Sequence, residues 1–399
     1  MSYNKKAVRI VFENNIKIKN KYGFPSSKLE GKHVLIQKMS FLNKKIIDFS
    51  DNAFGLDLSD LSVKVVQMED FGKDLRIRSF GSEKISLGSV SDGEIIDQKK
   101  VADAIRRAIK KSGPKKINTK KVICSLPETK AFLRIINIPK INPEEVKEAI
   151  KWEIEANIPV ALDQVYYDWQ ALEEKLGVDM ENKMSILVVA VSRKTINQFI
   201  DVLELAGLEV IGLEIESVAQ SRSLLGKEEQ KDTILTVDLG DRRTSISIAY
   251  KGVPCFTSSN PVSGQSLSGV IAKSLNVSFD EAEKIKIAKG IGSFVKEDAI
   301  FLAVKPVIEN LISEIEKSFD FYLAGLKYSK SIDRVIICGG GANTRGLVPY
   351  LSKRLGMEVK IGSPWIAAEL KTKLPIINKE ESVHYTTAIG LALTNYITH

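Results

Sequence analysis

Two segments of this sequence place an aspartate where an apolar strand runs into a turn of small polar residues and a second strand. In the first segment, residues 54–67, the aspartate is Asp57, and in the second, residues 234–248, it is Asp238. Each pattern predicts a β-hairpin whose turn can hold a phosphate on its backbone N–H groups. A single hairpin of this kind is more commonly an ordinary surface turn. Two copies about 180 residues apart predict two related lobes that face each other.

A run of three glycines, Gly339-Gly340-Gly341, follows the apolar segment Arg334–Cys338. Glycines after a strand let the backbone approach a ligand, and the N-terminus of a following helix attracts phosphate. The spacing is neither the Gly-x-Gly-x-x-Gly dinucleotide pattern nor a P-loop with Gly-Lys-Ser/Thr. A bare turn is the alternative for this run taken by itself.

The composition is that of a globular chain long enough for two or more domains, with 399 residues, 44% hydrophobic and 27% charged. No apolar run is long enough to cross a membrane, and the N-terminus lacks the apolar core of a signal peptide, so we expect a cytoplasmic protein. Three cysteines far apart in apolar surroundings predict reduced core thiols. Three histidines leave little material for a zinc site or a histidine-based triad.

The excess positive charge lies at the N-terminus. Residues 1–50 contain eleven Lys/Arg and three Asp/Glu, and this excess of eight equals the net charge of +8 of the whole chain. The remainder is neutral, so its charge does not indicate nucleic acid binding. Residues 1–38 are interpreted either as a basic tail or as sequence before a native start at Met39. Residues 40–49 are expected to lead into the first strand, with a short amphipathic membrane contact as the alternative.

The first half of the chain has the pattern of an α/β lobe followed by a distinct block. Its predicted elements are strands at Leu75–Phe80 and Lys84–Ser89 separated by Gly81, a helix around residues 101–109, and a strand at Lys121–Leu126. The block contains a helix at Glu145–Glu155 that begins at Asn142 and Pro143, strands at Val165–Leu172 and Ser185–Val191, and a helix at Lys194–Ala206. It carries no nucleophile or glycine cradle, which indicates either a protein contact or a structural insertion.

The second half repeats the strand pattern and then becomes helical. Strands are predicted at Thr233–Asp238, Ser245–Tyr250 and Pro254–Asn260, and helices at Gln265–Leu275, Asp280–Ala288 and Val304–Tyr328. The apolar positions of the last helix recur about every 3.6 residues, which favours core packing, with a coiled coil as the alternative.

Several of these segments resemble the PilM family, actin-like proteins of type IV pilus assembly related to FtsA. Besides the two hairpins, the resemblance rests on Ile138-Pro139, Ile158-Pro159, Tyr167-Asp168-Trp169, the Ala-Glu-x-x-Lys element within Leu275–Lys286, and Val335–Asn343. It covers roughly residues 50–396. It implies an α/β, actin-like two-lobed ATPase fold with a small α+β insert domain in the first lobe.

The resemblance also divides the chain. The expected parts are a basic N-terminal segment (residues 1–50), a first lobe or subdomain 1A (51–120 with 209–230), an insert domain 1C (121–208), a second lobe or subdomain 2A (231–262 with 330–399), and a subdomain 2B (263–329).

ATP with Mg²⁺ is the cofactor that the resemblance implies. The turns 59–62 and 240–243 would hold the β- and γ-phosphates, Asp57 and Asp238 would lie near Mg²⁺ and contact it through water, and the glycine run with Asn343 would lie near adenosine. The candidate nucleotide-binding residues are Asp57, Ser59, Ser62, Lys64, Asp238, Gly240, Arg242, Thr244, Gly339, Gly340, Gly341 and Asn343.

One residue departs from the family pattern. Ser59 stands where the family usually has glycine, and its Cβ disfavours a positive φ, although its hydroxyl offers a ligand instead. Glu216 is the candidate for activating water, with a structural role as the alternative. ATP binding is therefore better supported than turnover.

The resemblance implies a platform protein that lies at the inner face of the cytoplasmic membrane. Its expected partners are an N-terminal peptide of a PilN-like inner-membrane protein, PilB-type and PilC-type assembly components and further copies of itself, with no nucleic acid. The alternatives are an FtsA-like polymerising membrane tether and a small-molecule kinase of the same superfamily. The C-terminus lacks the basic amphipathic tail of the former, and no carboxylate base is evident for the latter.

Overall fold

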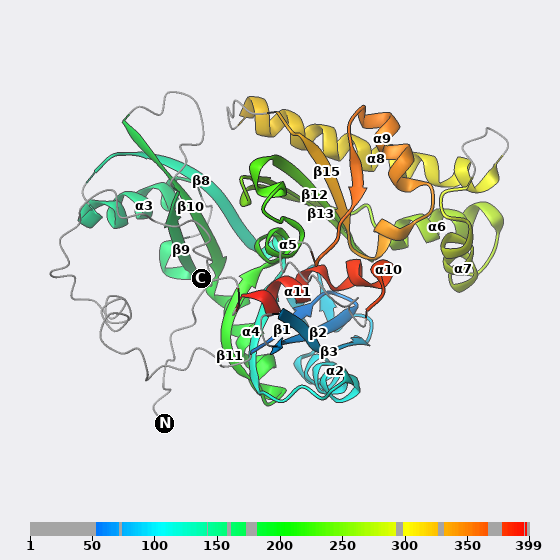
Figure 1. Ribbon diagram of the computed structural model, residues 1–399, viewed down its shortest axis with the longest axis horizontal. Coiled ribbons are helices and arrows are strands. Elements are labelled where there is room, and N and C mark those ends of the chain that lie inside the picture. Colours follow the sequence, from blue (N-terminus) through cyan, green and yellow to red (C-terminus); the bar gives the residue numbers. More distant parts are fainter. Residues whose placement is uncertain are drawn as a thin grey trace.

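The computed structural model describes residues 53–71, 74–141, 143–157, 161–172, 182–292, 298–325, 331–365, 377–394 and 396. The expectations for residues 1–50 and for Asn142 lie outside these ranges. Figure 1 shows two sheet-centred lobes, one above the other, and a smaller sheet beside them.

The first lobe is built on a six-stranded sheet in the order β11-β7-β1-β2-β3-β6. Its strands are β1 (Phe54–Leu58), β2 (Ser62–Phe71), β3 (Asp74–Lys84), β6 (Gly113–Pro114), β7 (Lys121–Leu126) and β11 (Glu209–Ile215). Helices α2 (Gln98–Lys111) and α4 (Arg193–Leu205) cover one face, and a short hairpin joins β4 (Val90–Ser91) to β5 (Glu94–Ile95). Every residue of β1 is buried, as expected for a strand with a neighbour on each side and both faces covered.

The expected break at Gly81 is absent, because β3 continues through it to Lys84. Helix α2 crosses the strand at this glycine, and a Cβ there would lie 3.0 Å from the carbonyl oxygen of Ala108. Gly81 therefore permits close helix–sheet packing, and the predicted strand Lys84–Ser89 is wrong.

The insert has its own three-stranded sheet, in the order β8-β10-β9, with one helix. Its elements are β8 (Ala131–Pro139), α3 (Pro143–Asn157), β9 (Val165–Ala171) and β10 (Lys183–Ser192). Ile150 and Ile154 of α3 pack on Ile186 and Val188 of β10. Strand β7 pairs with β1 and β11 in the first lobe's sheet, so the separate sheet spans 131–192 within the expected block 121–208.

The second lobe repeats the plan of the first. Its sheet has the order β14-β13-β12-β15-β16, with β12 (Thr233–Leu239), β13 (Thr244–Tyr250), β14 (Val253–Asn260), β15 (Arg334–Cys338) and β16 (Val359–Ile361). In both lobes a three-stranded antiparallel meander is followed by two parallel strands on the side of its first strand. The repetition expected from the two aspartate hairpins is therefore confirmed at the level of sheet topology.

The helices of the second lobe are α6 (Gly264–Leu275), α7 (Phe279–Lys289), α8 (Ala299–Asp320), α9 (Leu347–Leu355) and α10 (Lys379–Ser382). Leu311, Ile312 and Ile315 of α8 are buried in the core, as the periodicity predicted, and the helix packs against α6. It begins earlier than expected, at Ala299, and passes into a π-helical turn at Phe321–Gly325; the expected end at Tyr328 lies outside the described residues.

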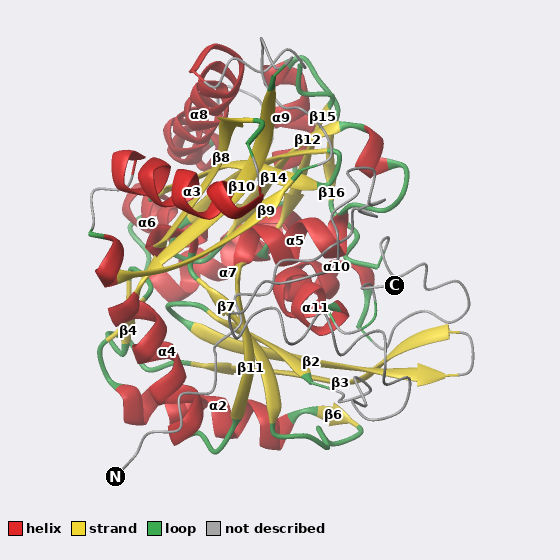
Figure 2. Ribbon diagram, turned by 90° about the vertical axis from the view of Figure 1, so that its left-hand side faces the viewer, coloured by secondary structure: helices red, strands yellow, loops and turns green. Residues whose placement is uncertain are grey.

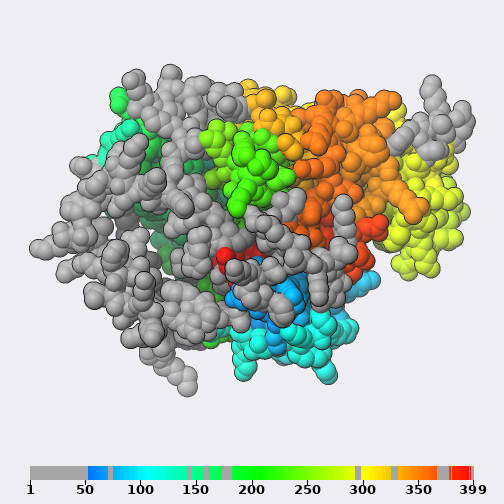
Figure 3. Space-filling view, viewed as in Figure 1, coloured from blue at the N-terminus to red at the C-terminus, as the bar shows by residue number. Residues whose placement is uncertain are grey.

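Two helices cross between the lobes, α5 (Glu216–Leu224) and α11 (Thr386–Leu393), as Figures 1 and 2 show. A Cβ on Gly390 would lie 1.9 Å from the carbonyl oxygen of Ala219, so the crossing requires glycine. Arg222 of α5 donates to the Gly390 carbonyl at 2.8 Å and forms a buried ion pair with Glu214. Figure 3 shows part of the first lobe below the second lobe on the same face.

Candidate functional site

A cavity lies between the lobes, where the meander turns of both sheets face each other. Its walls include nine of the sequence-predicted residues: Asp57, Ser59, Lys64, Glu216, Asp238, Gly240, Arg242, Gly339 and Gly340. Its volume is about 140 Å³, below the roughly 300–1,000 Å³ of typical small-molecule pockets.

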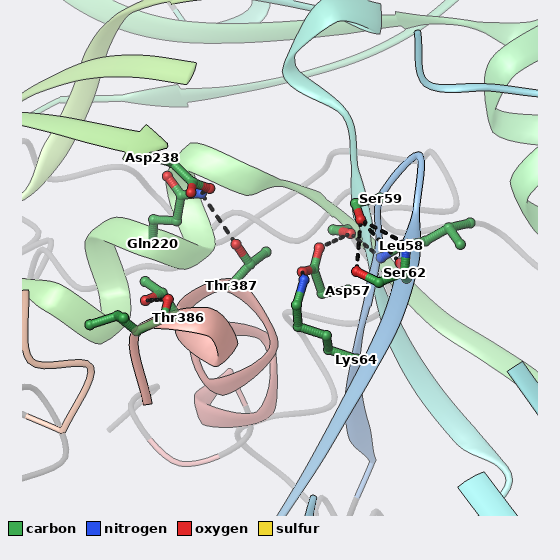
Figure 4. A network of polar contacts seen from close by, with 11 residues as sticks. Asp57, Leu58, Ser59, Ser62, Lys64, Gln220, Asp238, Thr386 and Thr387 are labelled. Atoms are coloured by element: carbon green, nitrogen blue, oxygen red, sulfur yellow. Dashed lines mark hydrogen bonds and ion pairs between the residues drawn. The ribbon is translucent and has the colours of Figure 1, made fainter. Parts of the chain in front are cut away.

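Asp57 stands at the end of β1 and is held on both carboxylate oxygens. Oδ1 accepts a hydrogen bond from Ser125 Oγ at 3.1 Å, and Oδ2 lies 3.3 Å from Lys64 Nζ (Figure 4). Ser125 Oγ in turn accepts the backbone N–H of Leu58 at 3.0 Å. The first aspartate is thus fixed by the neighbouring strands β2 and β7.

The first turn is closed by its own serines. Ser59 N donates to Ser62 O at 3.0 Å, and Ser62 N donates to Ser59 Oγ at 3.3 Å. The only non-glycine residues with positive φ in the described chain are Asp92, Lys251 and Asn276. Ser59 is therefore not strained, because the turn is built with a negative φ at that position. Ser62 does not line the cavity.

Asp238 stands at the corresponding place on β12, but its partner is neutral. Oδ2 accepts Nε2 of Gln220 at 2.6 Å, and the same amide lies 3.2 Å from Thr387 Oγ1 (Figure 4). Burial, together with the charge of Asp57, raises the pKa of Asp238 to about 6. The site therefore has two unequal carboxylates, of which Asp238 is the less stable as an anion.

In the second turn, two of the predicted residues line the cavity and one does not. Gly240 lines the cavity and its N–H donates to Arg243 O at 3.0 Å, while Arg242 also faces the cavity. Thr244 is buried and donates to Val262 O at 2.7 Å, so it does not line the cavity.

Two members of the glycine run line the cavity. Gly339 has a φ of +80°, and a Cβ there would lie 2.1 Å from Oδ1 of Asp238. Gly340 also lines the cavity, whereas Gly341 packs against Leu239. Asn343 donates to the backbone oxygen of Glu380 at 2.6 Å and lies away from the cavity walls.

Lys64 lies among several carboxyl side chains in the cavity. Burial would lower the pKa of the Lys64 ammonium, but Asp57 and Asp238 outweigh it and raise that pKa. Burial, with Asp57, Glu128 and Asp238 nearby, raises the pKa of Glu216 well above its ordinary value. Lys64 is thus favoured as a cation, whereas ionisation of Glu216 is disfavoured.

A cation in this cavity would have few protein ligands. Within the described ranges, no three His, Cys, Asp or Glu side chains come together as a metal-binding group. The two aspartates fit Mg²⁺ that keeps most of its water, since Mg²⁺ is usually bound by one or two carboxylates plus phosphates.

Three site residues were missed in the sequence. Gln220 of α5 holds Asp238, Thr387 of α11 accepts a hydrogen bond from the same Gln220 amide, and Ser125 holds Asp57. Gln220 lies one helical turn after Glu216, which was the only local signal. Ser125 lies in an apolar strand and Thr387 follows another threonine, and nothing in their local patterns marks them.

Two mixed-sheet lobes of repeated topology, joined by crossing helices around a cavity with one aspartate from each side, form the actin-like ATPase fold. Residues 55–396 match the family described as type IV pilus assembly protein PilM, and the chain belongs to that family. The family and fold expected from the sequence are thereby confirmed.

Solved structures and curated sequences are also similar to this chain. A structure described as a PilM-PilN type IV pilus biogenesis complex has a TM-score of 0.70 at 24% identity, covering 86% of this chain and 98% of that chain. The ethanolamine utilization protein EutJ from Carboxydothermus hydrogenoformans has a TM-score of 0.52 at 19% identity, covering 90% and 97%. Cell division protein FtsA of Enterococcus hirae is 22% identical over 347 residues, 78% of each chain.

No helix in the part of the chain that the structure describes is both long and apolar enough to cross a membrane.

Proposed function

We propose that this chain is a nucleotide-binding platform protein of type IV pilus assembly, with Mg²⁺-ATP in the interlobe cavity. The observation that carries the proposal is the meeting of Asp57 and Asp238 in one cavity, each at the end of the equivalent strand of its lobe. Gly339 supports it, because its missing side chain leaves room for Asp238 and for a ligand beside the backbone.

Different groups of the cavity would hold a triphosphate and its cation. Lys64 and Arg242 supply positive charge, and backbone N–H groups near Ser59 and Gly240 supply donors. Asp57 and Asp238 face the place where a hydrated Mg²⁺ would neutralise phosphate charge. A bound cation would also relieve the repulsion between the two carboxylates.

Binding is favoured over turnover. Glu216 is the candidate for activating a water, and its raised pKa disfavours the ionised form that would accept a proton. We propose weak or no ATPase activity in the isolated protein. Partner-driven closure that brings a cation beside Glu216 would lower that pKa and restore a base.

The proposed partner is a short N-terminal peptide of a PilN-like inner-membrane protein, bound by the insert. The structural neighbour described as a PilM-PilN complex supports this choice. Trp152 of α3 has 71% of its surface exposed, and an exposed tryptophan is a common anchor at protein interfaces. This partner would hold the protein at the inner face of the cytoplasmic membrane. PilB-type and PilC-type components and self-association remain further proposals.

Calorimetric titration with ATP and ADP, with and without Mg²⁺, tests the cavity. We expect binding that weakens at least tenfold in Asp57→Asn and Asp238→Asn, whereas Asp201→Asn on the exposed face of α4 serves as the charge-matched control. No binding of either nucleotide at millimolar concentration would refute the proposal.

The partner is tested by cross-linking the chain to the candidate peptide in ATP-bound and ADP-bound states. We expect the cross-links to map to the insert and its border with the first lobe. Cross-links confined to the second lobe would contradict this placement.

A further inference from the structure

A hairpin tip of the first lobe lies at the mouth of the cavity. Asp92 and Gly93 join β4 to β5, with φ values of 50° and 73°, the geometry of a tight two-residue turn. The carboxylate of Asp60 accepts the N–H of Asp92 at 3.1 Å and that of Gly93 at 3.0 Å. Thr129 Oγ1 donates to Asp92 O at 3.2 Å. The tip is therefore held in place by residues that themselves line the cavity.

The side chain of Asp92 reaches across to the second lobe. Its Oδ1 lies 2.7 Å from Nη1 of Arg243, whose Nε donates to Ser259 Oγ at 3.1 Å. Arg243 and Asp60 line both the inner cavity and an outer groove, and Asp92 lines the groove. The ion pair thus connects the two lobes where the groove meets the cavity.

We propose that the β4–β5 hairpin is a latch, in which Asp92 holds Arg243 while the cavity is empty and releases it to a phosphate group that enters. A guanidinium makes paired, charge-assisted hydrogen bonds to phosphate oxygens. The side chain of Asp92 is 69% exposed, so water weakens its ion pair and the exchange favours phosphate. Arg243 thereby becomes a nucleotide-binding residue, and its release links ligand arrival to lobe movement. The binding of phosphate by Arg243, which is the ligand half of the latch, rests on the proposed function. The ion pair that holds the two lobes together, which is the lobe half, does not.

Nucleotide kinetics test the ligand half, with Asp92→Asn as the main variant. The matched control is Glu94→Gln, which removes the same charge from the same hairpin but pairs with Lys194 inside the first lobe. In stopped-flow mixing with N-methylanthraniloyl-ATP, we expect association about two- to fivefold faster in Asp92→Asn than in Glu94→Gln, with undiminished affinity. Arg243→Gln should also associate faster but should lose about tenfold or more in affinity.

Equal association rates in Asp92→Asn and Glu94→Gln would overturn the latch as a barrier to entry. Unchanged affinity in Arg243→Gln would overturn the assignment of Arg243 as a phosphate ligand.

The lobe half is tested without nucleotide, by distances between spin labels. Lys99→Cys on α2 and Lys353→Cys on α9 give one exposed label in each lobe, and the three native cysteines are buried. We expect longer or broader distances in Asp92→Asn and a wild-type distribution in Glu94→Gln. Coincident distributions in all three proteins would refute the latch. If the wild-type chain binds neither nucleotide, the proposed function fails, while these distances still decide whether the latch exists.

Discussion

The two aspartates that face the cavity are compensated unequally. Asp57 forms an ion pair with Lys64 at 3.3 Å, whereas the hydrogen bond to the carboxylate of Asp238 comes from the neutral amide of Gln220. Because a neutral donor offsets less of the desolvation of a carboxylate than a cation does, Asp238 is the carboxylate that a bound cation would stabilise most. This asymmetry leads to a prediction about pH.

Asp238→Asn should change how stability depends on pH. The folded chain holds this proton with a pKa of about 6, against an ordinary value of 3.8, so over that interval the folded state binds more protons than the unfolded state. As the pH rises from 3.8 to 6, the wild-type chain therefore loses up to about 3 kcal/mol of stability that the raised pKa of Asp238 supplies at lower pH. The stability of the Asn variant relative to wild type should rise over about pH 4 to 6 and level off above about pH 7, measured by urea unfolding. Parallel profiles would show that the shift is absent.

Gly339→Ala should disrupt the site more than an ordinary change at a positive φ. The new Cβ would lie 2.1 Å from Oδ1 of Asp238, so the carboxylate must move. Gly356→Ala serves as a control, because its φ is also positive, at +66°, and no atom lies within 4 Å of its Cβ. It should lose about 1–2 kcal/mol of stability to backbone strain. Gly339→Ala should lose more, because its φ of 80° and ψ of 174° lie in a region essentially restricted to glycine, and only Gly339→Ala should lose nucleotide binding. Equal nucleotide affinity in the two variants would count against the site.

At the scale of elements, the crossing of α5 and α11 determines how closely the lobes approach. Glycine at position 390 brings the two helix backbones together, and Arg222 with Glu214 closes the crossing from the side. Gln220 of α5 holds Asp238 and donates to Thr387 of α11 as well, so the geometry of the site depends on this crossing.

Gly390→Ala should therefore destabilise the fold, although alanine is the better helix former. Its Cβ would lie 1.9 Å from Ala219 O, and overpacking of this kind costs about 1–3 kcal/mol. Gly269→Ala inside α6 meets nothing within 4 Å and should stabilise by about 0.5–1 kcal/mol. Thermal unfolding of both variants measures the opposite signs, and a stabilised Gly390→Ala would contradict the close crossing.

Because Arg222 and Glu214 form a buried ion pair at the crossing, the effects of replacing them on the free energy of unfolding should be strongly non-additive. Arg222→Met leaves the carboxylate of Glu214 buried without its cation and should cost about 3–5 kcal/mol. Adding Glu214→Leu removes the unpaired charge and should recover much of that loss. Urea unfolding of the single and double variants measures the coupling, and additive losses would disprove it.

At the scale of the whole molecule, β8 connects the cavity with the insert. Glu128 and Thr129, which line the cavity, directly precede this strand, and the strand runs from there along the full length of the insert sheet. Midway, the guanidinium of Arg134 lies 5.6 Å from the ring of Phe321 in the second lobe. The insert therefore contacts both lobes, and lobe movement should change its position.

This arrangement predicts that nucleotide and partner peptide change each other's affinity by the same factor, about 5- to 150-fold. Isothermal titration of each ligand in the presence and absence of the other measures the four affinities. Arg134→Gln, which removes the contact with the second lobe, should reduce the factor without changing the affinity for nucleotide alone. A factor of one in the wild-type chain would show that the insert does not respond to the cavity.

Most of what the sequence determined is local. Asp57, Asp238 and Gly339 were found from the order of apolar strand, acid and turn, because hairpins and glycine-dependent turns are specified by neighbouring residues. Helix and strand periodicity likewise located most of the elements, including α6, α7 and the strands of both meanders.

Tertiary structure decided which residues of those segments meet in the cavity. Thr244 pairs with Leu239 across the hairpin, and its hydroxyl donates to the backbone oxygen of Val262. The side chain of Asn343 donates to the backbone oxygen of Glu380 in α10. Gln220 joins the site from a helix, because the crossing brings α5 against β12. Such placements depend on packing between segments distant in sequence, and no local pattern records which side chain will face a shared cavity. The sequence alone determined the two aspartate hairpins, and the fold determined which side chains hold the two aspartates.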